Sequence, residues 1–251
     1  MALFDRTAKH LAAGPTVVLP ESRAKDVAEL LERYDPSLVR REDRFVCHNG
    51  VLLYGPVPAD EAGSVGYYAR AGAMPKREER PEQAKLLDGE RLVRGLALRY
   101  GGTMRSERPW AELGLEISVY AERAVSAEQV ISVLQPFAGN AGGQVLTVDE
   151  QEKVEGSYLL VSEEEPVFLT VFWPGYLSRS RQARPPLALG TLRDAQPCRW
   201  QLRTTQDIAT AEPRLCQLIT EAALALAKVT DGVVVDLYGF PVDRADELPA
   251  E

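Results

Sequence analysis

The chain has 251 residues, of which 45% are hydrophobic and 26% are charged. These values are typical of a globular protein with a full hydrophobic core, and they exclude a disordered or fibrous chain. The net charge of −8 argues against non-specific binding to nucleic acid or to an anionic membrane, because both need a basic protein surface.

The three cysteines, Cys47, Cys198 and Cys216, are too few and too far apart for a disulfide framework. The N-terminal residues lack the basic and apolar regions of a secretory signal. No stretch approaches the ~18–20 consecutive apolar residues that span a bilayer. We therefore expect a cytoplasmic protein with reduced thiols, although secretion without an N-terminal signal is compatible with the sequence.

Six elements are predicted in the first half of the chain. They are a strand at 16–19, a helix capped by Ser22 and ended by Asp35-Pro36, strands at 45–48 and 51–54, a helix from a cap at Asp88 to Tyr100, and a strand at 103–106. Asn49-Gly50 predicts a hairpin, because a type I′ turn needs positive φ at both central residues. Residues 56–82 show no sustained period and predict a long loop.

The second half predicts a similar series. It comprises a strand at 113–121, a helix capped by Ser126 and closed by Gly139, a strand at 144–148, a hairpin of 157–161 and 167–173, a strand at 199–205, a helix at 213–229 and a strand at 233–237. Ser126 and Gln129 have the spacing of a capping box. Residues 174–197 are rich in proline and predict irregular structure, and the acidic tail at 243–251 is expected to be loose.

The first half follows the order strand, helix, strand, strand, helix, strand, which is that of the ferredoxin-like split βαβ motif, and the second half shows the same skeleton with an inserted hairpin. Each half also ends with a long helix, a glycine and a strand, at Gly101-Gly102 and at Asp231-Gly232. We predict an α+β protein of two ferredoxin-like modules, 1–108 and 109–251, which lie side by side or share one mixed sheet. The second module carries an inserted hairpin and loop at about 150–197. The alternative is a chance recurrence of helices and strands separated by glycine.

No catalytic, cofactor-binding or metal-binding residue is predicted. Cys47 and His48 are adjacent on a strand and point to opposite faces, so Cys47 is expected in the core and His48 at the surface. The two histidines and three cysteines lack the spacing of a structural zinc site. The glycine-rich run at 139–143 follows a helix, whereas a phosphate-binding loop precedes one.

The segment at 172–186 combines aromatic and basic residues. Tryptophan, tyrosine and arginine are the residues enriched at binding hot spots, and arginine suits carboxylates. We predict that five residues of this segment bind an acidic partner surface: Trp173, Tyr176, Arg179, Arg181 and Arg184. The predicted loop at 56–82 adds further basic residues, among them Arg70, so it is a second candidate.

The composition and the lack of a chemical motif broadly resemble those of many bacterial proteins, including immunity proteins of toxin systems. That resemblance implies a non-enzymatic protein that binds another protein. The alternative is an enzyme or small-ligand binder with a polar site between the two modules. A structural or assembly component is a third hypothesis. The sequence indicates neither the oligomeric state nor the partner.

Overall fold

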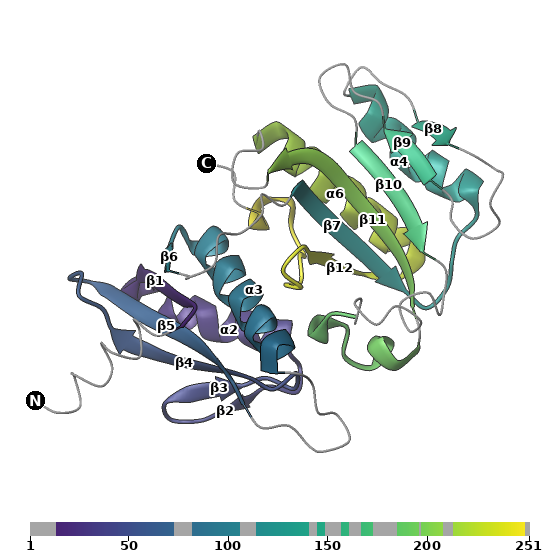
Figure 1. Ribbon diagram of the computed structural model, residues 1–251. Helices are drawn as coiled ribbons and strands as arrows, with labels where there is room; N and C mark the ends of the chain where they lie inside the picture. Colours follow the sequence, from purple (N-terminus) through teal and green to yellow (C-terminus); the bar gives the residue numbers. More distant parts are fainter. Residues whose placement is uncertain are drawn as a thin grey trace, which may run out of the picture. The chain divides into compact units, whose positions relative to one another are not determined.

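The computed structural model describes residues 14–72, 82–105, 114–140, 145–148, 157–160, 167–172, 185–195, 197–207 and 213–248. The chain divides into two compact units, Met1–Trp110 and Ala111–Glu251. The described strands form two six-stranded sheets rather than one shared mixed sheet, and their pairings are antiparallel (Figure 1). The chain is thus an α+β protein.

The described residues of the first unit form one sheet and two α-helices. Its elements are β1 (Thr16–Pro20), η1 (Glu21–Arg23), α2 (Ala24–Tyr34), β2 (Val39–Arg40), β3 (Arg44–Val46), β4 (Val51–Pro58), β5 (Ser64–Ala71), α3 (Glu82–Tyr100) and β6 (Thr103–Arg105). The strand order is β2-β3-β4-β5-β1-β6. Helix α3 packs on the sheet so closely that a Cβ at Gly89 would lie 3.0 Å from the Cβ of Ala69. Helix α2 lies beside α3, where the Tyr100 hydroxyl donates to the Asp26 carbonyl (3.0 Å).

The second unit repeats this arrangement. Its elements are β7 (Gly114–Ala121), α4 (Ala127–Asn140), β8 (Val145–Val148), β9 (Ser157–Leu160), β10 (Val167–Phe172), η3 (Leu187–Ala195), β11 (Cys198–Asp207), α6 (Pro213–Thr230), β12 (Val233–Asp236) and η4 (Ala245–Glu247). The strand order is β8-β9-β10-β11-β7-β12. Counted along each unit, the strands of both sheets therefore follow the same spatial order.

The two units also match at the end of their last long helix. The N–H of Gly102 donates to the carbonyl of Ala97 (2.9 Å), and that of Gly232 donates to the carbonyl of Ala227 (2.9 Å). The residue before each glycine has a positive φ, 64° at Gly101 and 51° at Asp231. This left-handed turn ends the helix and brings the glycine against the first strand of its unit, β1 or β7. The turn from the last long helix into the last strand therefore has the same backbone geometry in both units.

Register then relates the two cores residue by residue. Val18 on β1 pairs with Gly66 and Thr103, as Tyr120 on β7 pairs with Arg199 and Val233. The next residues along β5 and β11 are Tyr67 and Trp200, both fully buried. Neither the Tyr67 hydroxyl nor the Trp200 indole N–H has a hydrogen-bond partner among the residues that the structure describes. A large aromatic side chain thus fills the same place in both units.

Replacing Tyr67 with phenylalanine is expected to leave stability at neutral pH unchanged or to raise it, because an unpaired buried hydroxyl is destabilising. Burial raises the Tyr67 pKa from 10.0 to about 12, an effect that Arg40 partly opposes. The wild type therefore loses stability as pH rises through this interval, since the unfolded chain ionises first. Urea denaturation at several pH values should show a shallower alkaline loss in Tyr67→Phe, and a marked loss of stability at neutral pH would contradict it.

The predicted loop at 56–82 is wrong for most of its described residues. Strand β4 continues to Pro58, and β5 occupies Ser64–Ala71. Residues 65–69 are buried on both faces of the sheet, so the strand lacks the polar alternation that marks a half-buried strand.

The predicted hairpin of β3 and β4 is confirmed, but its turn differs from the predicted one. Gly50 has φ 82°, whereas Asp231 is the only described non-glycine residue with positive φ, so Asn49 does not form a type I′ turn.

Several predicted helix ends also differ. Ser22 lies in η1 and does not cap α2, which has no side-chain cap. Asp88 lies inside α3, where its carboxylate accepts from Asn49 Nδ2 (3.2 Å), and Gly139 lies inside α4. Tertiary contacts overrode these local signals. The capping box is confirmed, since Ser126 and Gln129 exchange N–H···O bonds of 3.0 and 3.3 Å.

The described part of the C-terminal tail is ordered against α6 rather than loose. Element η4 contacts α6, and Leu248 is buried. Apolar side chains that precede the tail, Phe240 and Val242, are also buried and anchor it. Across the described residues, no helix combines the length and the hydropathy of a membrane span.

Candidate protein-interaction face

The five residues predicted to bind a partner, Trp173, Tyr176, Arg179, Arg181 and Arg184, lie outside the described residues. Arg70, from the predicted loop, lies on β5 instead. It belongs to the face of the first sheet that points away from α3. Strand alternation places Val51, Leu53 and Ala69 against α3, so their neighbours Leu52, Tyr54, Tyr68 and Arg70 occupy the opposite face.

Four of these side chains form a stack across the sheet, which we call the Arg–Tyr stack (Arg44, Tyr54, Tyr68 and Arg70). Tyr54 pairs across the strands with both Arg44 and Tyr68. The two rings are nearly parallel, with centroids 4.9 Å apart and an interplanar angle of 5°. The Arg44 guanidinium lies 5.5 Å from the Tyr54 centroid, and the Arg70 guanidinium lies 5.6 Å from the Tyr68 centroid. A cation thus covers the outer face of each ring.

The chemistry left exposed by the stack is mainly that of hydrogen-bond donors. Arg70 is exposed, and 37% of the Arg44 side chain is accessible beside Asp43 (3.1 Å). Burial raises the pKa of Tyr68; Tyr54 and Asp43 act in the same direction, and Arg70 opposes them. The phenol therefore stays neutral at pH 7. The edge of a guanidinium presents two parallel N–H groups. These match the two oxygens of a carboxylate.

Register extends the face beyond the stack. Tyr68 pairs with Thr16, which in turn pairs with Arg105 on the edge strand β6. A second row runs through Val39, Val46 and Leu52 to Arg70. Val39 is 44% exposed, which is unusual for a large apolar side chain. We call the whole surface the Arg–Tyr face: Arg44, Tyr54, Tyr68, Arg70 and Arg105, with Val39, Val46 and Leu52.

The equivalent face of the second unit is internally paired. Arg199 Nη2 lies 2.6 Å from Glu116 Oε1, and Arg199 Nε donates to Ser118 Oγ (3.1 Å). The same guanidinium lies 5.8 Å from the centroid of the Tyr120 ring. The Arg199 and Glu116 side chains are only 15% and 21% exposed, so this ion pair is largely withdrawn from solvent. Glu116 therefore neutralises the charge of Arg199 within the unit.

Cys47 and its neighbours serve structure rather than chemistry. The thiol is buried, and its pKa is raised by burial first and then by Asp35 and Asp88. A thiol with a raised pKa is a poor nucleophile. His48 is exposed, so the prediction of a core cysteine beside a surface histidine is confirmed. Within the described ranges, no group of three or more His, Cys, Asp or Glu side chains is arranged to hold a metal ion.

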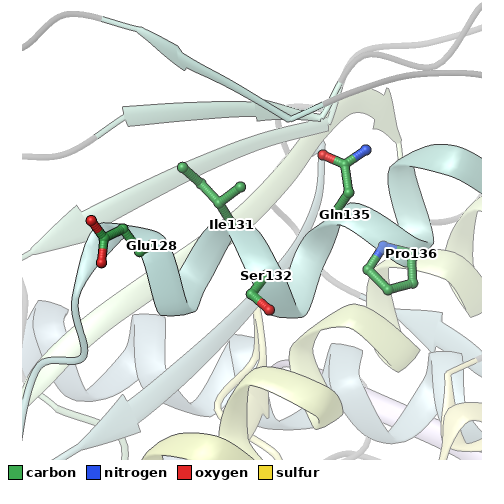
Figure 2. A pocket seen from close by; sticks show the side chains of 5 residues that line it. All are labelled: Glu128, Ile131, Ser132, Gln135 and Pro136. Carbon is green, nitrogen blue, oxygen red and sulfur yellow. The ribbon is translucent and has the colours of Figure 1, made fainter.

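An open pocket of about 760 Å³ lies on α4. Its described lining residues are Glu128, Ile131, Ser132, Gln135 and Pro136, which Figure 2 shows projecting from this one helix. Pro136 has no N–H, so it cannot donate to the Ser132 carbonyl one turn earlier. Among these residues the pocket offers one carboxylate, Glu128, and one hydroxyl, Ser132, and no basic side chain. This lining does not indicate acid–base or nucleophilic catalysis.

The sequence signal for the Arg–Tyr face was weak. Tyr68 and Arg70 are spaced for one face of a strand, but the strand itself showed no alternation. Arg44, Tyr54 and Arg105 lie on other strands, and only pairing register brings them into one surface. No known family model matches the chain, and neither curated proteins nor solved structures show a significant match to it.

Proposed function

We propose that this chain is a non-enzymatic protein-binding protein that recognises an acidic surface of its partner through the Arg–Tyr face. The single observation that carries the proposal is the Arg44–Tyr54–Tyr68–Arg70 stack on the side of the first sheet that points away from α3. Tyrosine and arginine are over-represented among binding hot spots. Their stacking also holds the two guanidinium groups in place, which lowers the entropy lost on binding.

The rest of the face supports a protein partner. Val39, Val46 and Leu52 add apolar surface beside the arginines, as in the mixed apolar and polar make-up of protein interfaces. A net charge of −8 over the whole chain makes a cationic face a local exception. Such a face steers an acidic partner toward one orientation.

The same geometry argues against single-stranded nucleic acid. Base recognition on a sheet uses exposed aromatic faces on which bases stack. Here each tyrosine has the other tyrosine on one side and a guanidinium on the other. Stacking of a base would first have to displace an arginine.

The proposal includes the finer fold and setting predicted from the sequence. The central order β4-β5-β1-β6 supports a ferredoxin-like module with β2 and β3 added at one edge, and β10-β11-β7-β12 supports the same assignment in the second unit. We propose a cytoplasmic, bacterial protein whose partnership resembles that of an immunity protein with its toxin.

The test compares the double variant Arg44→Glu/Arg70→Glu with the wild type. Tagged proteins are used to capture partners from an extract of the native cell, and the captured proteins are quantified by mass spectrometry. The amount of the specific partner captured by the double variant is expected to fall about tenfold or more, because two charge-assisted contacts become repulsive. Raised salt should weaken capture by the wild type.

Arg91→Glu is the matched control, because Arg91 is an exposed arginine of the same unit on α3. It reproduces half of the charge change without touching the Arg–Tyr face. Equal capture by the wild type, the double variant and the control would contradict the proposal. Circular dichroism checks that each variant is folded.

A further inference from the structure

In the second unit, η3 covers part of the equivalent sheet face. Leu189 of η3 packs on Tyr120 of β7 and Val235 of β12, and all three are at least 95% buried. Ala188, Leu192 and Val233 pack against this cluster. Gly190 interrupts the helical turns of η3 with φ 52° and ψ −123°. A short, kinked, apolar segment thus covers one end of the sheet.

The first unit has a matching row that is exposed. Val18 pairs with Thr103 as Tyr120 pairs with Val233, and Arg105 takes the place of Val235. Val18 is half-buried, and Thr103 and Arg105 are exposed. Val18 is a smaller side chain than Tyr120, which takes this place in the second unit. Arg105 in place of Val235 changes the chemistry at the edge from apolar to cationic.

We infer that a short segment of the acidic partner sits on the row Val18–Thr103–Arg105 as η3 sits on the second unit. This inference rests on the proposed function and names the occupant. An apolar side chain of the segment covers Val18, in the way that Leu189 covers Tyr120. A carboxylate of the segment pairs with Arg105, because a guanidinium at a partly apolar surface favours a bidentate carboxylate.

Charge favours a partner over a second copy of this chain. Two copies that met symmetrically through this face would bring two sets of these arginines into one interface, since a two-fold interface uses the same patch of both copies. Arg105 also belongs to the same face as Arg44 and Arg70 by register, so one acidic partner can contact all three. The row therefore lies on the same sheet face as the surface proposed above, with the buried Thr16 between Arg105 and Tyr68.

The experiment places a photo-crosslinking amino acid at Thr103 in the full chain and, as a control, at Arg91. After irradiation in the native cell, mass spectrometry identifies the crosslinked peptide. We expect a crosslink from position 103 to a peptide that contains aspartate or glutamate beside apolar residues, and none to that peptide from position 91. In the position-103 protein, Arg105→Glu should lower the crosslink yield about tenfold, and Arg105→Lys should retain most of it.

The outcomes separate this inference from the proposed function. A crosslink to a second copy of the chain, or to a peptide without acidic residues, overturns the inference. So does the absence of a position-103 crosslink when Arg44→Glu/Arg70→Glu still abolishes capture, and in that case the proposed function stands. If the double variant captures the partner normally, the proposed function fails whatever position 103 crosslinks.

Discussion

Replacing Asp35 with alanine is expected to lower the free energy of unfolding by about 3 kcal/mol. The Asp35 side chain is 1% exposed, and its two oxygens accept from two backbone N–H groups. Oδ2 accepts from His48 (2.6 Å), and Oδ1 accepts from Ser37 (2.9 Å). Both bonds involve a charged acceptor, so each contributes more than an ordinary hydrogen bond.

The carboxylate joins the end of α2 to the loop between β3 and β4, 13 residues further along the chain. Alanine leaves both N–H groups without this acceptor, whose own site is almost fully buried. Asp35→Asn keeps one acceptor oxygen and is expected to cost about half as much. Urea denaturation measures the loss, and hydrogen exchange at the His48 amide reports it locally.

Asp26→Ala is the control for the Asp35 variants. Asp26 is an aspartate of the same unit whose side chain is 41% exposed and pairs with Arg23 at 3.0 Å. Its removal is expected to cost less than about 1 kcal/mol, because exposed ion pairs contribute little. Similar losses in Asp26→Ala and Asp35→Ala would show that the buried acceptor is not the cause.

Gly102→Ala is expected to destabilise the first unit by about 3 kcal/mol. An added Cβ would lie 2.3 Å from Leu19 Cδ2 and 2.7 Å from the Val18 carbonyl oxygen. Leu19 is almost fully buried, and the carbonyl belongs to β1, which is paired on both sides, so neither moves without disturbing the core. The same change at Gly232 would place a Cβ 2.8 Å from the Tyr120 carbonyl oxygen and should destabilise the second unit similarly.

Gly101→Ala separates this steric effect from backbone strain. Gly101 has φ 64°, but a Cβ there would meet nothing within 4 Å. Its cost should be only about 1 kcal/mol, which is the penalty of alanine in the left-handed region. Thermal and urea denaturation of Gly101→Ala, Gly102→Ala and Gly232→Ala rank their losses of stability. A loss at Gly101→Ala as large as that at Gly102→Ala would contradict the packing argument.

The elements that were predicted correctly are those with local signals. Residues 213–229 have a long helical stripe, and α6 covers Pro213–Thr230. The alternation of Leu115, Ile117, Val119 and Ala121 marks β7, whose buried side they form. Gly101-Gly102 and Asp231-Gly232 predicted the helix ends, because a positive φ is a property of one residue and its neighbours.

The predictions that failed concern residues whose role depends on distant parts of the chain. Strand β5 was missed because both of its faces are covered, which removes the alternation of period two. Asp88 has the residue type of a cap, but its carboxylate bonds to Asn49 from the interior of a longer helix. A buried carboxylate such as Asp35 looks in sequence like any helix-ending aspartate.

By itself, the sequence determined the α+β class, most of the helices and strands, and the recurrence of helix, glycine and strand at the end of each half. These follow from periodicity and from single-residue backbone preferences, which act over a few residues. Only the tertiary structure decided which side chains share a face. Arg44, Tyr54 and Tyr68 lie on three strands, and it is the pairing register, a property of strands brought together by folding, that places them in one stack.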